Sequence, residues 1–445
     1  MTREHCLSNT AGFIALIAIT LLSACAPSEP LLLTPAQAYG AKPAYNYPIS
    51  DPYAATVITL PADMKVDYSA VPEPEDKKIT LFKDRTIPEG FWYQRGLHYS
   101  ELLQTAPAPL VYIIPGIGAD AHAGVMRTIA NILYTAGYSV VLLPSPGNPN
   151  FIINASENNL PGNPVQDARD IYHLMLAIEG DVSHKTNVTG HMLVGYSLGG
   201  WQAAFTAKLD SEKKLLNFSK VLLINPPLNL YSSVKTLDND LTRDLPHGMN
   251  DADHFIKNII TRLSNVSQTG EAFDFTNEDL RLDVYNKTHP SDDQLATIIG
   301  LSFRLTAADM VFTSDVMRHS GYIFPKNKPF TTSTDLNPYL AVAVRTGFGD
   351  YLNEVLYEEE HAKNPALTKQ DFMAASNLES IGSYISHNRN MGLITNRDDI
   401  ILARGELDRV VRLFGPNAVV FPSGGHMGNI AHPAMAYQII TFMKQ

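Results

Sequence analysis

The stretch "HMLVGYSLGGWQAAF", residues 191–205, decides how the rest of the sequence is interpreted. It begins as an apolar run typical of a buried strand and continues as a run typical of a helix. At the junction, Ser197 stands between Gly195 and Gly199 in the pattern G-x-S-x-G. Glycines at these positions let neighbouring backbone pass close to a serine in a strained turn, with its hydroxyl exposed at the carboxyl end of the strand. Ser197 is therefore a candidate nucleophile.

Runs of the same two kinds surround this stretch. Four all-apolar strands alternate with amphipathic helices over residues 108–227, and the rhythm returns with the strand "MGLITN" from Met391, the strand "NAVVFP" and a closing helix at 433–443. Such alternation indicates an α/β fold with a mostly parallel sheet and helices on both faces. Two short β-like runs, "ATVITL" from Ala55 and "KITLFK" from Lys78, could open the sheet.

The rhythm stops between the two parts of this pattern. Residues 228–388 contain helical and loop segments, among them "DADHFIKNIITRL" and "DDQLATIIGLSFRLTAADMVF". We interpret them as a large helical cap inserted into one core, which consists of residues 52–227 and 389–445. The alternative is a separate C-terminal domain, but two strands and two helices could bury little sheet alone.

The N-terminus has the features of a targeting segment. Arg3 precedes the apolar run "FIALIAITLL", residues 13–22, which is short for a membrane span, so we expect a signal peptide over residues 1–24. The following "LSAC" resembles the lipobox of bacterial lipoproteins, which implies that Cys25 is lipidated and begins the mature chain. Ala26 after this cysteine favours, by the same resemblance, the outer membrane facing the periplasm. The alternative is an ordinary secretory signal and a secreted protein.

Residues 25–51, rich in Pro and Ala, are expected to form a tether.

Composition and charge exclude several classes of function. The net charge of −11 argues against a nucleic-acid partner. The other cysteine, Cys6, lies in the expected signal peptide, so the mature chain would have no disulfide and no thiol nucleophile. No P-loop, no G-x-G-x-x-G and no paired histidines at helical spacing were found, so we predict no cofactor and no metal.

Around Ser197 the chain resembles the α/β-hydrolase superfamily, and Ser197 matches the superfamily's nucleophile. A serine hydroxyl needs a base to take its proton and an acid to orient that base. The superfamily's chain order places the histidine in a loop after the last strand. "FPSGGHMGN" puts His426 directly after "NAVVFP", so the resemblance implies that His426 is the base.

The acid is expected just past the strand "MGLIT". Aligning "LITN" with the superfamily's strand end selects Asp399, and a shift of one residue would select Asp398 instead. Asp408 in "GELDRVV" is rejected because that segment has helical spacing. It would also leave no crossover helix before the next parallel strand.

The developing oxyanion needs fixed N–H donors. The resemblance places them at Leu198, which follows the nucleophile, and at Ile117 in "PGIG", where relatives carry H-G-x-G with histidine in place of Pro115. No motif in the sequence identifies residues that bind the substrate. The implied function is hydrolysis of a carboxylic ester through an acyl-enzyme, with a lipid-like acyl compound as one candidate substrate. Alternatives are an amidase, peptidase or acyltransferase with the same triad, or a binding lipoprotein that has lost catalysis. The oligomeric state cannot be read from the sequence.

Overall fold

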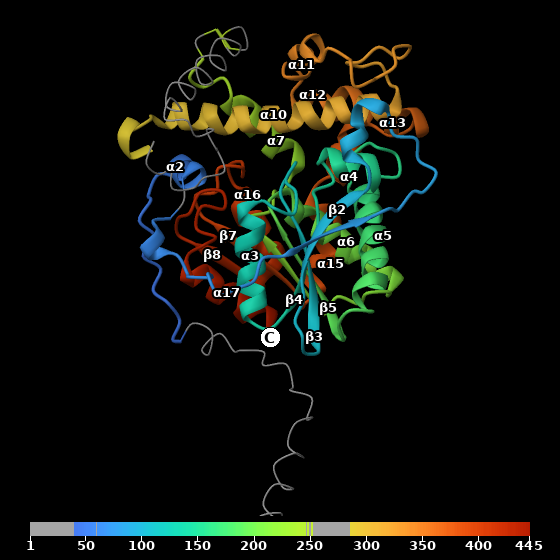
Figure 1. The fold of residues 1–445 in the computed structure, drawn as a ribbon. Coiled ribbons are helices and arrows are strands. Elements are labelled where there is room, and N and C mark those ends of the chain that lie inside the picture. Colours follow the sequence, from blue (N-terminus) through green and yellow to red (C-terminus); the bar gives the residue numbers. More distant parts are fainter. Residues whose placement is uncertain (1–39, 59, 246, 249–250, 252–284) are drawn as a thin grey trace, which may run out of the picture.

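A computed structural model describes residues 40–58, 60–245, 247–248, 251 and 285–445 of the chain (Figure 1). The expected signal peptide and Cys25 lie outside these residues, as does nearly all of the helix predicted at 251–263.

A single sheet of eight strands forms the centre of the molecule, in the order β1-β2-β4-β3-β5-β6-β7-β8. Strands β3 to β8 run parallel, and β2 is antiparallel to both β1 and β4. The strands are β1 (Glu75–Ile79), β2 (Leu97–Leu102), β3 (Ala108–Ile114), β4 (Ser139–Leu142), β5 (Val188–Tyr196), β6 (Lys220–Ile224), β7 (Met391–Asn396) and β8 (Ala418–Phe421). The predicted mostly parallel sheet is thus confirmed.

Helices cover both faces of this sheet and its carboxyl-end edge. They are α2 (Pro52–Val57), α3 (Gly124–Thr135), α4 (Pro149–Asn154), α5 (Pro164–Val182), α6 (Leu198–Lys213), α7 (Leu230–Asp240), α10 (Asp292–Arg318), α11 (Asn337–Ala343), α12 (Phe348–Asp350), α13 (Tyr357–Lys363), α14 (Lys369–Ala375), α15 (Gly382–His387), α16 (Glu406–Phe414) and α17 (Pro433–Met443). A π-helical turn, Tyr351–Leu356, joins α12 to α13.

Alternate side chains of the strands enter two separate cores. Tyr112 and Ile114 of β3 pack with α5 and α6 on one face, while Val111 and Ile113 pack with α3 and α17 on the other. All four of these side chains are fully buried. Burial on both faces explains why the strand sequence is apolar throughout, and the arrangement is that of an α/β-hydrolase fold.

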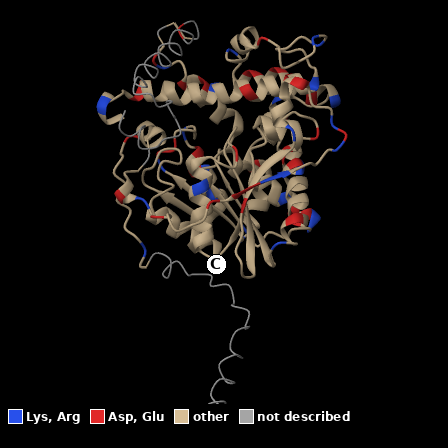
Figure 2. Cartoon of the chain, viewed as in Figure 1, with Lys and Arg blue, Asp and Glu red and all other residues tan. Residues whose placement is uncertain are grey.

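The described elements between β6 and β7 are all helices; α7 and α10 to α13 lie over the carboxyl-end edge of the sheet, whereas α15 packs beside α16 (Figure 1). The longest, α10, crosses above the strands. It is long and apolar enough to pass for a membrane span, but 67% of its most apolar window is buried within the molecule, as in a core helix. Charged residues lie mainly on the surrounding helices and loops, and the central strands carry few of them (Figure 2).

The structure corrects the expectations for the N-terminal part. The first three residues of the run from Ala55, expected as a strand, belong to α2, which begins with Pro52 after the capping residue Asp51. The first strand, β1, starts three residues before the run predicted from Lys78 and ends at Ile79, and β2 was not expected at all.

The segment expected to be a tether through residue 51 contacts the core from Tyr45 onward. The ring centroid of Tyr45 lies 4.6 Å from that of Phe421 and 4.9 Å from that of His432. Its hydroxyl also accepts a hydrogen bond from Asn429 Nδ2 at 3.0 Å. Aromatic side chains bury large apolar areas when they pack in this way. Any free tether must therefore end before Tyr45.

Candidate active site

Ser197 lies in a tight turn whose neighbouring positions accept few residue types. The strand β5 ends at Tyr196, and α6 begins at Leu198, with Ser197 between them at φ 54° and ψ −130°. A Cβ on Gly195 would lie 2.1 Å from the carbonyl oxygen of Gly199, and a Cβ on Gly199 would lie 2.2 Å from that of Ile114. Both positions therefore require glycine. The pattern found in the sequence corresponds to a strained backbone that holds a serine at the end of a strand.

Three of the sequence-predicted residues form one hydrogen-bonded chain. His426 Nε2 lies 2.8 Å from Ser197 Oγ, and His426 Nδ1 lies 2.9 Å from Asp399 Oδ1. The three residues follow β5, β7 and β8, whose carboxyl ends lie at one edge of the sheet. With a proton on Nδ1 held by the carboxylate, Nε2 is free to accept the proton of the serine hydroxyl.

The two neighbouring aspartates have different surroundings. The Asp399 side chain is fully buried and accepts hydrogen bonds from Asn225 Nδ2 at 2.6 Å and from the N–H of Ile401 at 3.2 Å, in addition to its contact with His426. Asp398 instead accepts the N–H groups of Gly424 and Gly425, at 3.1 and 3.0 Å. Burial raises the pKa of Asp398 above its ordinary value, although these two donors oppose the shift. The structure brings Asp399, and not Asp398, to the imidazole.

Asn225 supports the acid and was missed by the sequence analysis. It directly follows β6, is fully buried, and has a left-handed backbone at φ 47°. Its N–H donates to the carbonyl of Ile394 at 2.8 Å, which fixes the backbone beside β7. Asparagine adopts this conformation more readily than most residues. A polar residue at the carboxyl end of an apolar strand, in "LLINPP", was the one signal that could have identified it.

The candidate oxyanion donors lie on either side of the serine. Leu198 is the first residue of α6, where backbone N–H groups have no partner within the helix. On the other side, a Cβ placed on Gly116 would be 3.2 Å from the Cβ of Ser197 and 3.6 Å from its Oγ, so the loop that contains Ile117 runs beside the nucleophile. Within the described part of the chain, neither Leu198 nor Ile117 uses its N–H in a hydrogen bond. Both donors are therefore available to a ligand.

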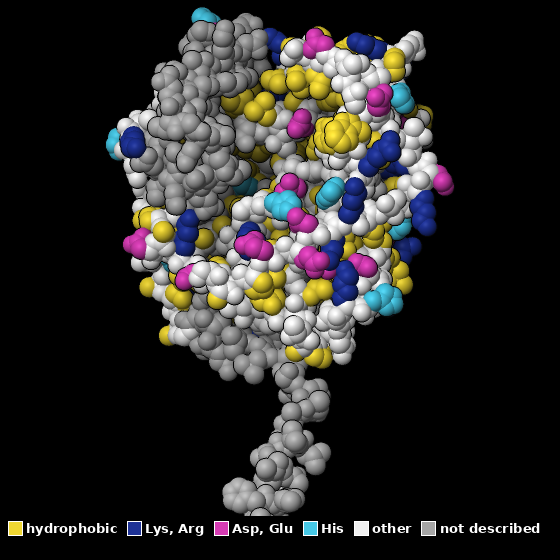
Figure 3. Space-filling view, in the orientation of Figure 1, with side chains coloured by type: hydrophobic (Ala, Val, Ile, Leu, Met, Phe, Trp, Pro, Cys, Tyr) yellow, Lys and Arg dark blue, Asp and Glu magenta, His cyan; other side chains and the backbone are white. Residues whose placement is uncertain are grey.

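Helix α10 lies against this loop. A Cβ on Gly118, which has φ +69°, would be 2.1 Å from Cγ2 of Thr306, and the sulfur of Met310 lies near Gly147 beside Ile117. Ile298 and Leu305 are exposed on the same helix, at 39% and 45%. Figure 3 shows hydrophobic side chains gathered along this part of the molecule, above a hollow in the face. The surroundings of the loop are thus partly apolar.

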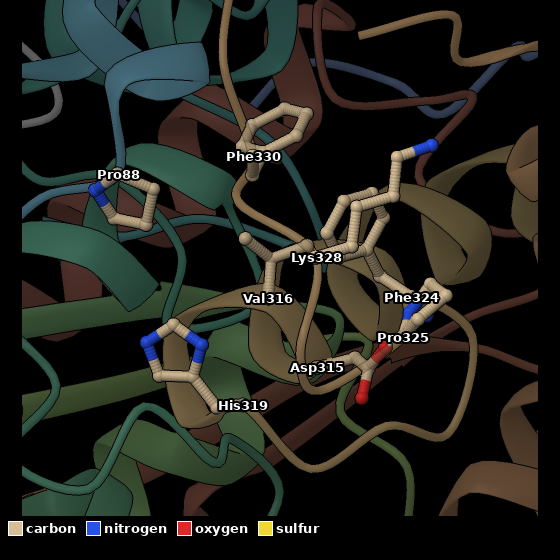
Figure 4. A pocket seen from close by; sticks show the side chains of 8 residues that line it. All are labelled: Pro88, Asp315, Val316, His319, Phe324, Pro325, Lys328 and Phe330. Atoms are coloured by element: carbon tan, nitrogen blue, oxygen red, sulfur yellow. Dashed lines mark hydrogen bonds between the residues drawn. The ribbon is translucent and has the colours of Figure 1, made fainter.

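A small pocket near the C-terminal end of α10 is separate from this site (Figure 4). It has a volume of about 20 Å³ and lies between Pro88, Phe324, Phe330 and the end of α10. That volume holds about one water molecule. Neither Ser197 nor His426 lines it. Among the described residues, no group of three His, Cys, Asp or Glu side chains could hold a metal ion.

No known family matches the sequence, and no curated protein does either. Solved structures with a similar arrangement include a proline iminopeptidase-related protein of Thermus thermophilus (12% identity, 83% of this chain and 96% of that chain, TM-score 0.39). Others are an esterase of Pyrococcus furiosus (12%, 84% and 92%, 0.40) and a fungal esterase of Rhizomucor miehei (13%, 89% and 97%, 0.42). Similarity at this level says nothing about what this chain acts on, so its function has to come from its own site.

Proposed function

We propose that the chain is a lipid-anchored serine hydrolase that cleaves a carboxylic ester through an acyl-enzyme on Ser197. The observation that carries the proposal is the hydrogen-bonded chain from Ser197 Oγ through His426 to the buried Asp399. A strained serine, an imidazole within 2.8 Å and a buried carboxylate behind it are the parts that nucleophilic acyl transfer requires.

In the proposed reaction, Ser197 Oγ attacks the ester carbonyl while His426 Nε2 takes the hydroxyl proton. Asp399 stabilises the resulting imidazolium through Nδ1–H. The N–H groups of Leu198 and Ile117 then hold the negative oxygen of the tetrahedral intermediate. When that intermediate collapses, His426 returns the proton to the leaving alkoxide, and the acyl group stays on Ser197. Water, activated by His426, releases the acid and restores the serine.

An apolar acyl group is favoured by one feature of the structure and by the proposed location. Ile298 and Leu305 expose apolar side chains on α10, the helix that contacts the oxyanion loop through Thr306. The expected lipid on Cys25 would keep the protein at a membrane, where lipid-like esters are abundant. We propose the bacterial cell envelope, at the periplasmic side of the outer membrane, as its location. The triad does not fix the leaving group, so amides and transacylation use the same machinery.

The test is hydrolysis of p-nitrophenyl esters from acetate to palmitate by the full chain in detergent, beside Ser197→Ala. We expect the unmodified protein to hydrolyse these esters and Ser197→Ala to be inactive. The preferred acyl chain length would indicate the length of the acyl-binding site. Covalent labelling of Ser197 by a fluorophosphonate without ester turnover would indicate an amide, peptide or acyl-transfer substrate. The absence of both labelling and turnover would refute the proposed hydrolase function and would leave a binding lipoprotein.

The anchor is tested separately. Replacing Cys25 with alanine should move the protein from the membrane fraction to the soluble fraction, because the acyl chains would be lost. An unchanged distribution would refute lipidation at this residue while leaving the proposed chemistry untouched.

A further inference from the structure

Helix α2 lies directly against the loop that contains His426, although 370 residues separate the two in the sequence. A Cβ on Gly425 would be 2.3 Å from the carbonyl oxygen of Pro52, and a Cβ on Gly428 would be 1.9 Å from that of Ala55. The backbone of the loop therefore touches the backbone of α2 on both sides of the histidine. Figure 1 shows α2 on the side of the molecule that contains β7 and β8.

One side chain of α2 bonds to the histidine itself. The Thr56 hydroxyl donates to the carbonyl of Pro52 at 2.7 Å and accepts the backbone N–H of His426 at 2.9 Å. Because its hydrogen is held by the helix, its lone pairs are directed toward the loop. Thr56 thus gives the His426 N–H an acceptor of fixed position.

The loop depends on partners of this kind. Gly424, Gly425 and Met427 all have positive φ, at 142°, 55° and 71°. Such a backbone forms no regular ladder of hydrogen bonds, so its N–H and C=O groups need partners outside the loop. Asp398 accepts two N–H groups on one side, and Asn396 donates to the carbonyl of Gly425 at 2.8 Å. Thr56 supplies the bond to the histidine residue from the other side.

Helix α2 is itself held firmly enough to act as a support. Asp51 caps it by accepting the N–H of Ala54 at 2.6 Å, and Ala54 and Ala55 are fully buried. Six residues are too few for a stable isolated helix, so packing on the loop must stabilise α2 as α2 stabilises the loop.

We propose that Thr56 is a positioning residue for the catalytic base, an inference that rests on the proposed hydrolase function. It holds the backbone of His426 so that Nε2 stays within hydrogen-bond distance of Ser197 Oγ while Nδ1 stays on Asp399. A displacement of about 1 Å at a reacting group can lower a rate by about 100-fold. A support at the backbone of the base is therefore expected to affect the rate of the chemical step more than the binding of substrate.

The experiment compares three variants of the full chain. Thr56→Val keeps the shape and removes the hydroxyl, and Thr56→Ser restores the hydroxyl. Thr441→Val is the matched control, because Thr441 makes the same bond to the carbonyl four residues back, at 2.7 Å in α17, and is as partly exposed as Thr56. The readouts are kcat and KM for a p-nitrophenyl ester, the rate of fluorophosphonate labelling, and the melting temperature.

We expect Thr56→Val to lower kcat and the labelling rate by about 10- to 100-fold with KM little changed, and Thr56→Ser to recover most of the loss. Thr441→Val should resemble the unmodified protein in kcat. Normal kcat in Thr56→Val, or a Thr56→Ser variant as impaired as Thr56→Val, would overturn the inference. Both results are distinguishable from failure of the proposed function. In that case the unmodified protein would not be labelled, and Ser197→Ala would be no less active than the unmodified protein.

Discussion

Two neighbouring aspartates allow the proposed mechanism to be tested with one substitution made twice. Asp399→Asn changes the group that faces His426 Nδ1, whereas Asp398→Asn changes a group that holds the loop backbone. An amide at 399 can offer Nδ1 an N–H, which selects the wrong tautomer, or an uncharged oxygen, which no longer stabilises the imidazolium. Substitution of the acid of such a triad by its amide lowers kcat by about 10⁴-fold.

Asp398→Asn should have a much smaller effect. The amide keeps one oxygen for Gly424 or Gly425 and loses the other bond, and a hydrogen bond to a charged group contributes about 1.5 to 3 kcal/mol. Even if all of that were lost from the transition state, the rate would fall by about 10- to 100-fold, well short of the loss expected for Asp399→Asn. Burial already raises the pKa of Asp398, so replacing its carboxylate with a neutral amide also relieves part of the cost of desolvation.

The assay is kcat and KM for one p-nitrophenyl ester at one pH, with melting temperatures to confirm that both variants fold. We expect Asp399→Asn to be nearly inactive and Asp398→Asn to keep at least about a hundredth of the activity. Equal losses in two folded variants, or a larger loss in Asp398→Asn, would refute the assignment of Asp399 as the acid.

Two further predictions concern buried polar groups. Asn225→Ala removes a donor from the buried carboxylate of Asp399, a bond of about 1.5 to 3 kcal/mol, so kcat should fall about 10- to 100-fold at constant KM; an unchanged kcat would contradict a role for Asn225. Asp167 accepts hydrogen bonds from Gly162 N–H and Gln202 Nε2, and burial raises its pKa from 3.8 to about 8. Because the folded state holds the proton more tightly, Asp167 stabilises the fold most below about pH 4 and loses that contribution as the pH rises to about 8. Asp167→Asn, which cannot ionise, should therefore be more stable than the unmodified protein at pH 8 to 9, by on the order of a few kcal/mol, and the difference should shrink toward pH 5; urea unfolding at several pH values that shows parallel curves would contradict this.

Much of the core could be predicted because its signals are local. The strand β3, the last four residues of β5 and the last four residues of β6 are buried and almost entirely apolar, which distinguishes them from the amphipathic helices between the strands. The glycines at 195 and 199 are required by contacts within the turn and with the adjacent strand end. Asp408 lies in α16, as its helical spacing indicated.

The N-terminal part could not be predicted as well, because its conformation depends on distant residues. The run from Ala55 is rich in β-branched residues, which favour strands, yet Ala54 and Ala55 pack as a helix against the loop of Gly425 and Gly428. Asp51 followed by Pro52 was a local signal for a helix start, and it outweighed that preference. No local pattern connects Thr56 to His426, since the two meet only in the folded chain.

The parallel sheet and the N-terminal segment therefore contribute differently to the candidate site. Parallel strands place Ser197, Asp399 and His426 at one edge, because each residue follows the carboxyl end of its own strand. That placement alone leaves the loop after β8 with several residues at positive φ, which form no regular ladder of hydrogen bonds. Asp398 and Asn396 hold this loop from one side, and Thr56 holds it from the other. Without α2 the loop would keep Asp398 and Asn396 but would lose the acceptor for the N–H of His426. The site is complete only when the first and the last parts of the described chain have come together.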